Sequence, residues 1–213
     1  MKKSWMSFTM AALIGGSLTL GIASNAFAAD PHVVSAGPQH QSGVQRAAKT
    51  AQIPAATGRE LYDFHFFVNH NDTPLYFSPD NVFNELHRCF NCSFPVPGAP
   101  AEFPAFGQHL PLRPSAFGIC QDAPVAAQPY DPSHVIRLIA LPGHFDGEGS
   151  TVDFTFFNNV SGPGQGLLIL RVQAHVTNPR IPDEVNKRFA EAEWKTFADQ
   201  LGNNLFPHAD KRT

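Results

Sequence analysis

The sequence predicts an α+β fold in which a curved antiparallel sheet packs against one long helix at the C-terminal end of the chain. Four stretches, at 61–68, 133–141, 151–158 and 167–176, carry the apolar residues of β-strands. Residues 182–201 instead place apolar side chains at helical spacing. Because strands and helices do not alternate along the chain, a parallel βαβ sheet is excluded and an antiparallel sheet is favoured.

The first strand has one apolar and one polar face. Its apolar residues recur at every second position: Tyr62, Phe64, Phe66 and Val68. Asp63 and His65 point the other way because strand side chains alternate. A short helix follows the strand, since Ser78 is a good N-cap, Pro79 suits the first helical position, and Asp80 interacts favourably with the helix dipole.

Nine prolines occupy the stretch from Phe94 to Pro132, too many for central strands or long helices. We expect an edge strand at 108–112 and ordered loop elsewhere in this stretch. Beyond it, the loop 162–166 joins the last two strands as a hairpin, because glycine and proline dominate it. In the last strand, Arg171, Gln173 and His175 share one polar face.

The C-terminal helix is predicted from Pro182 to Leu201, with Asp183 and Glu184 in its first turn. Gly202 can end it as a left-handed stop. Its expected buried stripe consists of Val185, Phe189, Ala192, Phe197 and Leu201, with Trp194 beside them. One architecture with this element order is the helix-grip fold, in which a curved sheet wraps a terminal helix and leaves an apolar cavity.

The start of the chain has the pattern of a signal peptide. Lys2 and Lys3 precede an apolar run of about 13 residues, and the small residues Ala26 and Ala28 then mark a cut before Ala29. The run is too short to span a bilayer, which needs ~20 residues. We therefore expect residues 1–28 to be removed and the protein to be secreted or periplasmic. Residues 29–57 are predicted as a flexible lead-in, 58–205 as a single domain and 206–213 as a tail.

Charge excludes some partners. The formal net charge of −3 becomes −5 when Lys2 and Lys3 are removed with the signal peptide. A mildly acidic protein lacks the basic surface with which proteins bind nucleic acid or anionic lipid. No nucleic-acid partner and no membrane-spanning segment are expected.

The three cysteines predict one disulfide. Cys120 is expected to pair with Cys92, or with Cys89 as the alternative, and so to join the end of the first helix to the proline-rich stretch. A redox role is disfavoured because Cys89 falls in a last helical turn, where the dipole does not stabilise a thiolate. No second ligand pair stands at a spacing typical of zinc, so neither a metal nor a cofactor is expected.

Histidines supply the candidate catalytic residues. Asp63 and His65 share a strand face, as do Arg171 and His175, and His144 lies in a glycine-rich segment with Asp146 and Glu148. The set His144, His65, His175, Asp63 and Arg171 could form a hydrolytic or nuclease site. The alternative interpretation is the solvated side of a half-covered sheet and an ordinary turn. The usual hydrolase, metal and nucleotide motifs are absent from the sequence.

Phenylalanine is abundant, with 19 in the chain. Four of them on the apolar strand faces are candidates for lining a cavity and binding a ligand: Phe64, Phe66, Phe154 and Phe156. The alternative is that these side chains simply fill a core.

Three short segments carry a resemblance: 78–83 (SPDNVF), 141–145 (LPGHF) and 194–198 (WKTFA). Their ordering over residues 60–205 resembles bacterial exported proteins and toxin-type C-terminal domains of unassigned activity. It is also similar to the helix-grip (START-like) ligand-binding superfamily. The proline-rich stretch differs from the regular β-hairpins of that superfamily. The resemblance implies an antiparallel sheet around a helix and supplies no catalytic residues.

Two functions follow as hypotheses. The first is an exported, non-enzymatic binding or effector domain with an aromatic-lined pocket for an apolar small molecule or lipid. The alternative is a secreted bacterial toxin that acts as a His-dependent hydrolase or nuclease. The sequence is compatible with both an enzyme and a binding protein.

Overall fold

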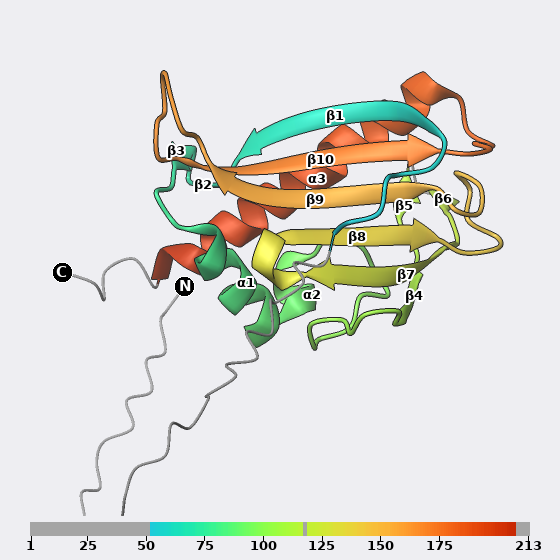
Figure 1. Ribbon diagram of the computed structural model, residues 1–213, viewed down its shortest axis with the longest axis horizontal. Coiled ribbons are helices and arrows are strands. Elements are labelled where there is room, and N and C mark those ends of the chain that lie inside the picture. Colours follow the sequence, from blue (N-terminus) through green and yellow to red (C-terminus); the bar gives the residue numbers. More distant parts are fainter. Residues whose placement is uncertain (1–51, 117–118, 208–213) are drawn as a thin grey trace, which may run out of the picture. The chain divides into compact units, whose positions relative to one another are not determined.

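A six-stranded antiparallel sheet with one long helix on its face organises the described residues, 52–116 and 119–207, of the computed structural model (Figure 1). The strands follow the order β1-β10-β9-β8-β7-β4. Their bounds are Arg59–Phe67 for β1, Leu168–Val176 for β10, Thr151–Asn158 for β9, Val135–Ala140 for β8, Ala123–Tyr130 for β7 and His109–Leu112 for β4. The helix α3 spans Asp183–Leu205. This is the predicted α+β, helix-grip-like arrangement.

Smaller elements complete the fold. Two short hairpins pair β2 with β3 and β5 with β6, and three short helices join α3 in the described part of the chain. Their bounds are Asn69–His70 for β2, Thr73–Pro74 for β3, Ser115–Ala116 for β5, Ile119–Cys120 for β6, Pro79–Arg88 for α1, Phe90–Ser93 for α2 and Asp131–Ser133 for η1. The predicted start of α1 is confirmed, and Ser78 and Asn81 cap it reciprocally. The predicted signal peptide, most of the lead-in and most of the tail lie outside the described residues.

Strand alternation gives the sheet an inner face toward α3 and an outer face. On β10 the inner residues are buried and the outer ones are partly exposed. Register places Phe64 of β1 and Phe154 of β9 on either side of Val172, so the inner apolar residues form continuous rows across strands. The loop 162–166 connects β9 to β10 as predicted.

The proline-rich stretch contains one strand that was not predicted. The strand β7 lies inside the sheet, between β4 and β8, although it contains Pro124 and Pro129. Each proline has a strand partner on one side only, since Pro124 pairs with β4 and Pro129 pairs with β8. The carbonyl of Pro124 accepts a hydrogen bond from the Leu141 N–H, beyond the end of β8. In an antiparallel sheet the N–H and C=O of one residue point to the same side, so the N–H that Pro124 lacks would point away from β4. Its absence therefore costs β4 no hydrogen bond. The prediction of loop outside 108–112 was therefore wrong for β7, whereas the edge strand β4 is confirmed.

The helix α3 continues past its predicted end. Gly202 is a buried residue within α3 and not a left-handed stop, and the helix ends at Leu205. A Cβ at Gly202 would overlap the backbone of Asn69, so glycine here allows α3 to approach β2 closely. The predicted stripe is correct at Phe197 and Leu201 but wrong at Val185, which is 40% exposed, and at Ala192, which is also exposed.

Aromatic rings join α3 to the inner face of the sheet. The ring of Phe197 meets those of Phe154 and Phe156 edge to face, with centroids 5.6 and 6.1 Å apart. Phe94 from the segment after α2 also packs against Phe154 and Phe197. Edge-to-face pairs of buried rings add to the stabilisation from burial, so this cluster holds the two layers together.

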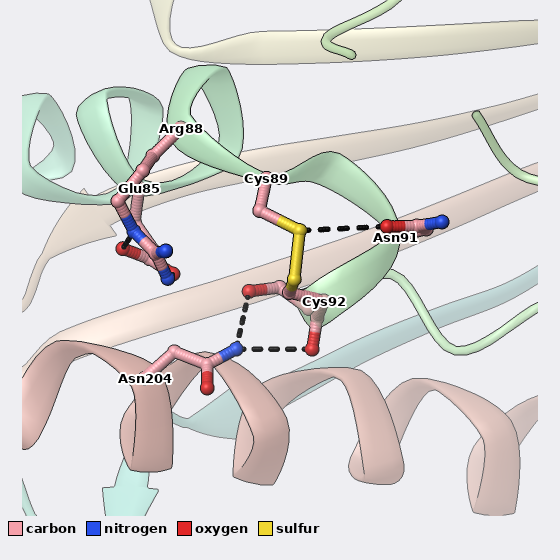
Figure 2. Close-up of a disulfide and its surroundings, with 7 residues drawn as sticks. Glu85, Arg88, Cys89, Asn91, Cys92 and Asn204 are labelled. Carbon is pink, nitrogen blue, oxygen red and sulfur yellow. Dashed lines mark hydrogen bonds and ion pairs between the residues drawn. A yellow bond between two sulfur atoms is a disulfide. The ribbon is translucent and has the colours of Figure 1, made fainter. Parts of the chain in front are cut away.

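The disulfide differs from the prediction. Cys89 pairs with Cys92 and not with Cys120, and the two Cα atoms are 5.3 Å apart (Figure 2). The chain turns from α1 into α2 at Cys89, which brings residues three apart within the distance that a disulfide requires. Asn204 of α3 donates hydrogen bonds to the Cys92 carbonyl and to Ser93 Oγ, as Figure 2 also shows for the carbonyl. The disulfide therefore stiffens a turn that contacts α3.

Residues 52–57 run along the outer face of the sheet (Figure 1). The guanidinium of Arg137 donates to Asp153 at 2.6 Å through both Nε and Nη2, and its Nη1 donates to the Pro54 carbonyl. Thr57 Oγ1 donates to the Gly149 carbonyl at 2.8 Å. Arg137 is only 5% exposed, and these partners balance its charge and give each of its three nitrogens an acceptor.

Replacement of Gly202 tests the close approach of α3 to β2. Gly202→Ala is expected to lower the free energy of unfolding by about 3 kcal/mol, because the new methyl group meets the Asn69 backbone. Helix propensity alone would raise it by about 1 kcal/mol, so the sign is diagnostic. Urea denaturation measures the change. Glu191→Ala at an exposed position of α3 is the control, with a change within about 0.5 kcal/mol. A Gly202→Ala protein as stable as the parent would contradict the contact.

Candidate functional site

A cavity of about 70 Å³ lies between the inner face of the sheet and the N-terminal half of α3. All six strands of the sheet contribute to its lining, together with the loop 141–150. Most of the lining is apolar and includes small residues: Val96, Leu112, Pro114, Ala123, Val125, Leu138, Ala140, Val152, Ala174, Val176, Phe189 and Ala190. The other lining residues are aromatic or polar: Tyr62, His144, Phe145, Asp146, Ser150, Thr151, Asn186, Glu193 and Trp194.

Tyr62 and Trp194 form a hydrogen-bonded aromatic pair in the lining. The Trp194 Nε1–H donates to the Tyr62 hydroxyl at 3.0 Å. Tyr62 is 8% exposed, and burial raises the pKa of its hydroxyl, which therefore stays protonated. Within the described part of the chain, this hydroxyl receives a hydrogen bond but has no acceptor for its own hydrogen. The pair thus offers the cavity one unused donor.

His144 is held neutral in the loop between β8 and β9. Its Nδ1 accepts the backbone N–H of Asp146 at 3.0 Å, so the ring proton is on Nε2. Burial, helped by the positive charge of Arg180, lowers the pKa of His144 from 6.5 to about 4. Arg180 donates to the carbonyls of Gly143 and His144 at 2.7 and 2.8 Å, which fixes the loop. At neutral pH, His144 Nε2–H is therefore a neutral donor.

Asp146 is a buried acid with one amide partner. The Asn186 side-chain amide of α3 donates to Asp146 Oδ1 at 2.5 Å. Burial raises the pKa of Asp146 from 3.8 to about 6, against the lowering effect of that hydrogen bond. His144 Nδ1 lies 4.0 Å from Asp146 Oδ2, but the two do not form an ion pair at neutral pH, because the ring is uncharged. Burial also raises the pKa of Glu193 on α3.

The predicted catalytic residues do not gather at one place. Strand alternation puts Asp63, His65, Arg171 and His175 on the outer face of the sheet, whereas His144 lines the cavity on the inner side. Arg171 donates to both carboxylate oxygens of Asp63, at 2.8 and 2.5 Å, and this bond lowers the pKa of Asp63. The outer residues therefore form a polar sheet surface, and the predicted five-residue hydrolytic site does not form.

The four predicted ligand-binding phenylalanines are also elsewhere. Phe154 and Phe156 are at most 2% exposed and belong to the core cluster with Phe197. Phe64 stacks on the Tyr62 ring at a centroid distance of 4.6 Å, and Phe66 packs against Phe64. None of the four is among the described residues that line the cavity.

Few features of the sequence point to the residues that line the cavity. The space exists where alanine side chains are too short to fill it, and no pattern in the sequence distinguishes these alanines from others in the core. Asn186 could have been noticed, since it is a polar residue on the buried side of an amphipathic helix. Among the described residues, no three His, Cys, Asp or Glu side chains are grouped to hold a metal ion. In the same part of the chain, no helix is both long and apolar enough to cross a membrane.

Three solved structures resemble the fold at low identity. A protein from Thermus thermophilus is 11% identical with a TM-score of 0.45, and the match covers 70% of this chain and 98% of that one. The Zhui aromatase/cyclase from Streptomyces sp. R1128 is 11% identical with a TM-score of 0.47, covering 70% and 95%. Ginseng major latex-like protein 151 from Panax ginseng is 16% identical with a TM-score of 0.41, covering 64% and 93%. No family model and no curated protein matches the sequence.

Substitution of the two buried titratable groups has opposite effects on stability across acidic pH. The lowered pKa of His144 contributes stability that is lost as pH falls from 6.5 to about 4. The raised pKa of Asp146 destabilises the fold increasingly as pH rises from 3.8 to about 6. Each effect is about 3 kcal/mol at most.

Asp146→Asn is therefore expected to become more stable relative to the parent as pH rises from 4 to 6. His144→Asn is expected to become more stable relative to the parent as pH falls from 6.5 to 4. Both replacements keep an oxygen where the hydrogen-bond acceptor stood. Urea denaturation at several pH values measures the differences, and differences that do not vary with pH would contradict the burial of these groups.

Proposed function

We propose that the protein is an exported binding protein whose cavity takes a small ligand with an apolar body and one polar group. The observation that carries the proposal is the cavity itself, a mostly apolar space between α3 and the sheet that contains unused hydrogen-bonding groups. Its volume is well above the ~10–15 Å³ that one water molecule needs. Transfer of the apolar surface of a ligand from water into this cavity lowers the free energy and so favours binding.

The polar groups give such a ligand an orientation. The Tyr62 hydroxyl hydrogen and His144 Nε2–H can donate to a ligand, and the carboxyl groups of Asp146 and Glu193 can accept from it. A few polar groups in an apolar lining are typical of small-molecule sites. The small volume favours a small molecule over a lipid with long acyl chains.

The alternative of a His-dependent hydrolase or nuclease has no comparable support. Such a site needs a base, a partner that orients it and a position for the substrate between them. His144 faces the cavity with its Nδ1 already bonded to the Asp146 backbone, and the other candidates lie on the outer face. No observation favours a toxin.

Ligand binding can be followed by the fluorescence of Trp194. The chain has two tryptophans, Trp5 and Trp194, so a Trp5→Phe background leaves only the one in the cavity lining. Titration with benzyl alcohol is expected to change its emission in a saturable way. Ala190→Leu fills the cavity and is expected to weaken this binding at least tenfold, whereas the same change at the exposed Ala192 of α3 is not. Equal binding by both variants would overturn the proposal, as would the absence of a saturable change in the parent with benzyl alcohol and with its amine and carboxylate analogues.

Export is proposed from residues 1–28, whose charged start, apolar run and small residues fit a signal peptide. When the full chain is expressed in a bacterium, the exported form is expected to begin at Ala29. Ala28→Leu is expected to block the cut, because a large residue replaces the small one before the cleavage point, whereas Phe27→Leu is expected to leave it intact. Intact-mass measurement of the exported and retained forms reads the result. A chain retained with Met1 in place would contradict export.

A further inference from the structure

The charges around the cavity have one sign. Asp146 and Glu193 supply two carboxyl groups from the loop 141–150 and from α3. Among the described residues that line the cavity, none is Lys or Arg. The guanidinium of Arg180 lies outside the lining and is bonded to the Gly143 and His144 carbonyls. A charged ligand would thus meet carboxylates and no cationic side chain in the lining.

These two carboxyl groups are removed from water in part and have few hydrogen-bond donors in exchange. Asp146 has one side-chain donor, the Asn186 amide at its Oδ1, and no donor to its Oδ2 among the described residues. Glu193 receives no side-chain hydrogen bond in the same part of the chain and is shielded from water in part. A carboxylate that has lost water without gaining a cation is destabilised, as the raised pKa values of both groups show. A positive charge in the cavity would remove that cost.

The rest of the lining also suits a cation. Four aromatic side chains face the space: Tyr62, Phe145, Phe189 and Trp194. Aromatic faces attract ammonium groups, most strongly those of Trp and Tyr, when water is excluded. Tyr62 and Trp194 are held in place by their mutual hydrogen bond, so their rings are already positioned.

An anionic ligand is the main competitor. Its carboxylate could accept from the Tyr62 hydroxyl and from His144 Nε2–H. However, it would share a partly buried space with Asp146 and Glu193, and like charges there repel one another. His144 cannot compensate because its ring is neutral at pH 7.

We propose that the ligand carries a protonated amine, which pairs with Asp146 and Glu193 while its apolar part fills the cavity. This inference rests on the proposed binding function and adds the chemical class of the ligand. The amine would donate to the free oxygen of Asp146 and to the Glu193 carboxylate, and the aromatic rings would contact the carbon atoms next to it.

Three probes of nearly equal shape test the proposal at pH 7.5 on the full chain with Trp5→Phe: benzylamine, benzyl alcohol and benzoate. Trp194 fluorescence gives each dissociation constant. Benzylamine is expected to bind at least tenfold more tightly than benzyl alcohol, and benzoate more weakly than both. Asp146→Asn and Glu193→Gln are each expected to reduce benzylamine affinity several-fold more than they reduce benzyl alcohol affinity, because only the amine carries a charge that pairs with the carboxylate. The control Glu191→Gln removes a carboxyl group from the exposed side of α3 and is expected to change neither.

The outcomes separate the two proposals. Benzyl alcohol that binds as tightly as benzylamine, or benzoate that binds best, overturns the amine inference and leaves the binding function standing. Loss of benzylamine binding in Glu191→Gln to the same extent as in Asp146→Asn would show a surface charge effect and also overturn it. If none of the three probes changes Trp194 emission in a saturable way, the binding function itself fails.

Discussion

The packing of α3 against the inner face of the sheet is the constraint on which the rest of the structure depends. Toward its C-terminal end, Phe197 and Leu201 are fully buried, and Gly202 lies against the Asn69 backbone, so no space remains. Toward its N-terminal end, Asn186 and Ala190 line a partly open cavity, which small strand residues such as Ala140 and Ala174 also line. One helix is therefore both the closing element of the core and one wall of the site. The close contact at one end fixes the helix and so preserves the space at the other.

The chemistry of the cavity follows from burial more than from any individual residue. The same loss of water lowers the pKa of His144 and raises that of Asp146, although the two are only two positions apart. Near neutral pH the result is an uncharged imidazole beside a carboxylate, and the two do not form an ion pair. The site consequently offers neutral donors together with negative charge. That combination distinguishes between ligands by charge as well as by shape.

Local patterns predicted most of the architecture because they express short-range physics. The alternation around Phe64 and Asp63 correctly assigned the faces of β1, and the cap at Ser78 located the start of α1. The strand β7 was not predicted because a proline disrupts a sheet only where an adjacent strand would accept a hydrogen bond from the missing N–H. Whether such a strand is present depends on the pairing of β7 with β4 and β8, which the local sequence does not contain. Gly202 was misread for a similar reason, since a glycine can end a helix or admit another backbone to it, and only the position of Asn69 decides between them.

By itself, the sequence determined most of the secondary structure, the antiparallel α+β class and the polarity of each strand face, because these depend on residue order within a few positions. Tertiary structure alone decided which side chains share a space. It separated His144 from His65 and His175 by placing them on opposite faces, placed Phe154 and Phe156 in the core, and brought Asp146 to Asn186 across 40 positions. It also closed the disulfide within one turn, leaving the predicted Cys120 partner aside. The physical reason is that a cavity is what packing leaves unfilled, and unfilled volume is a property of several elements together.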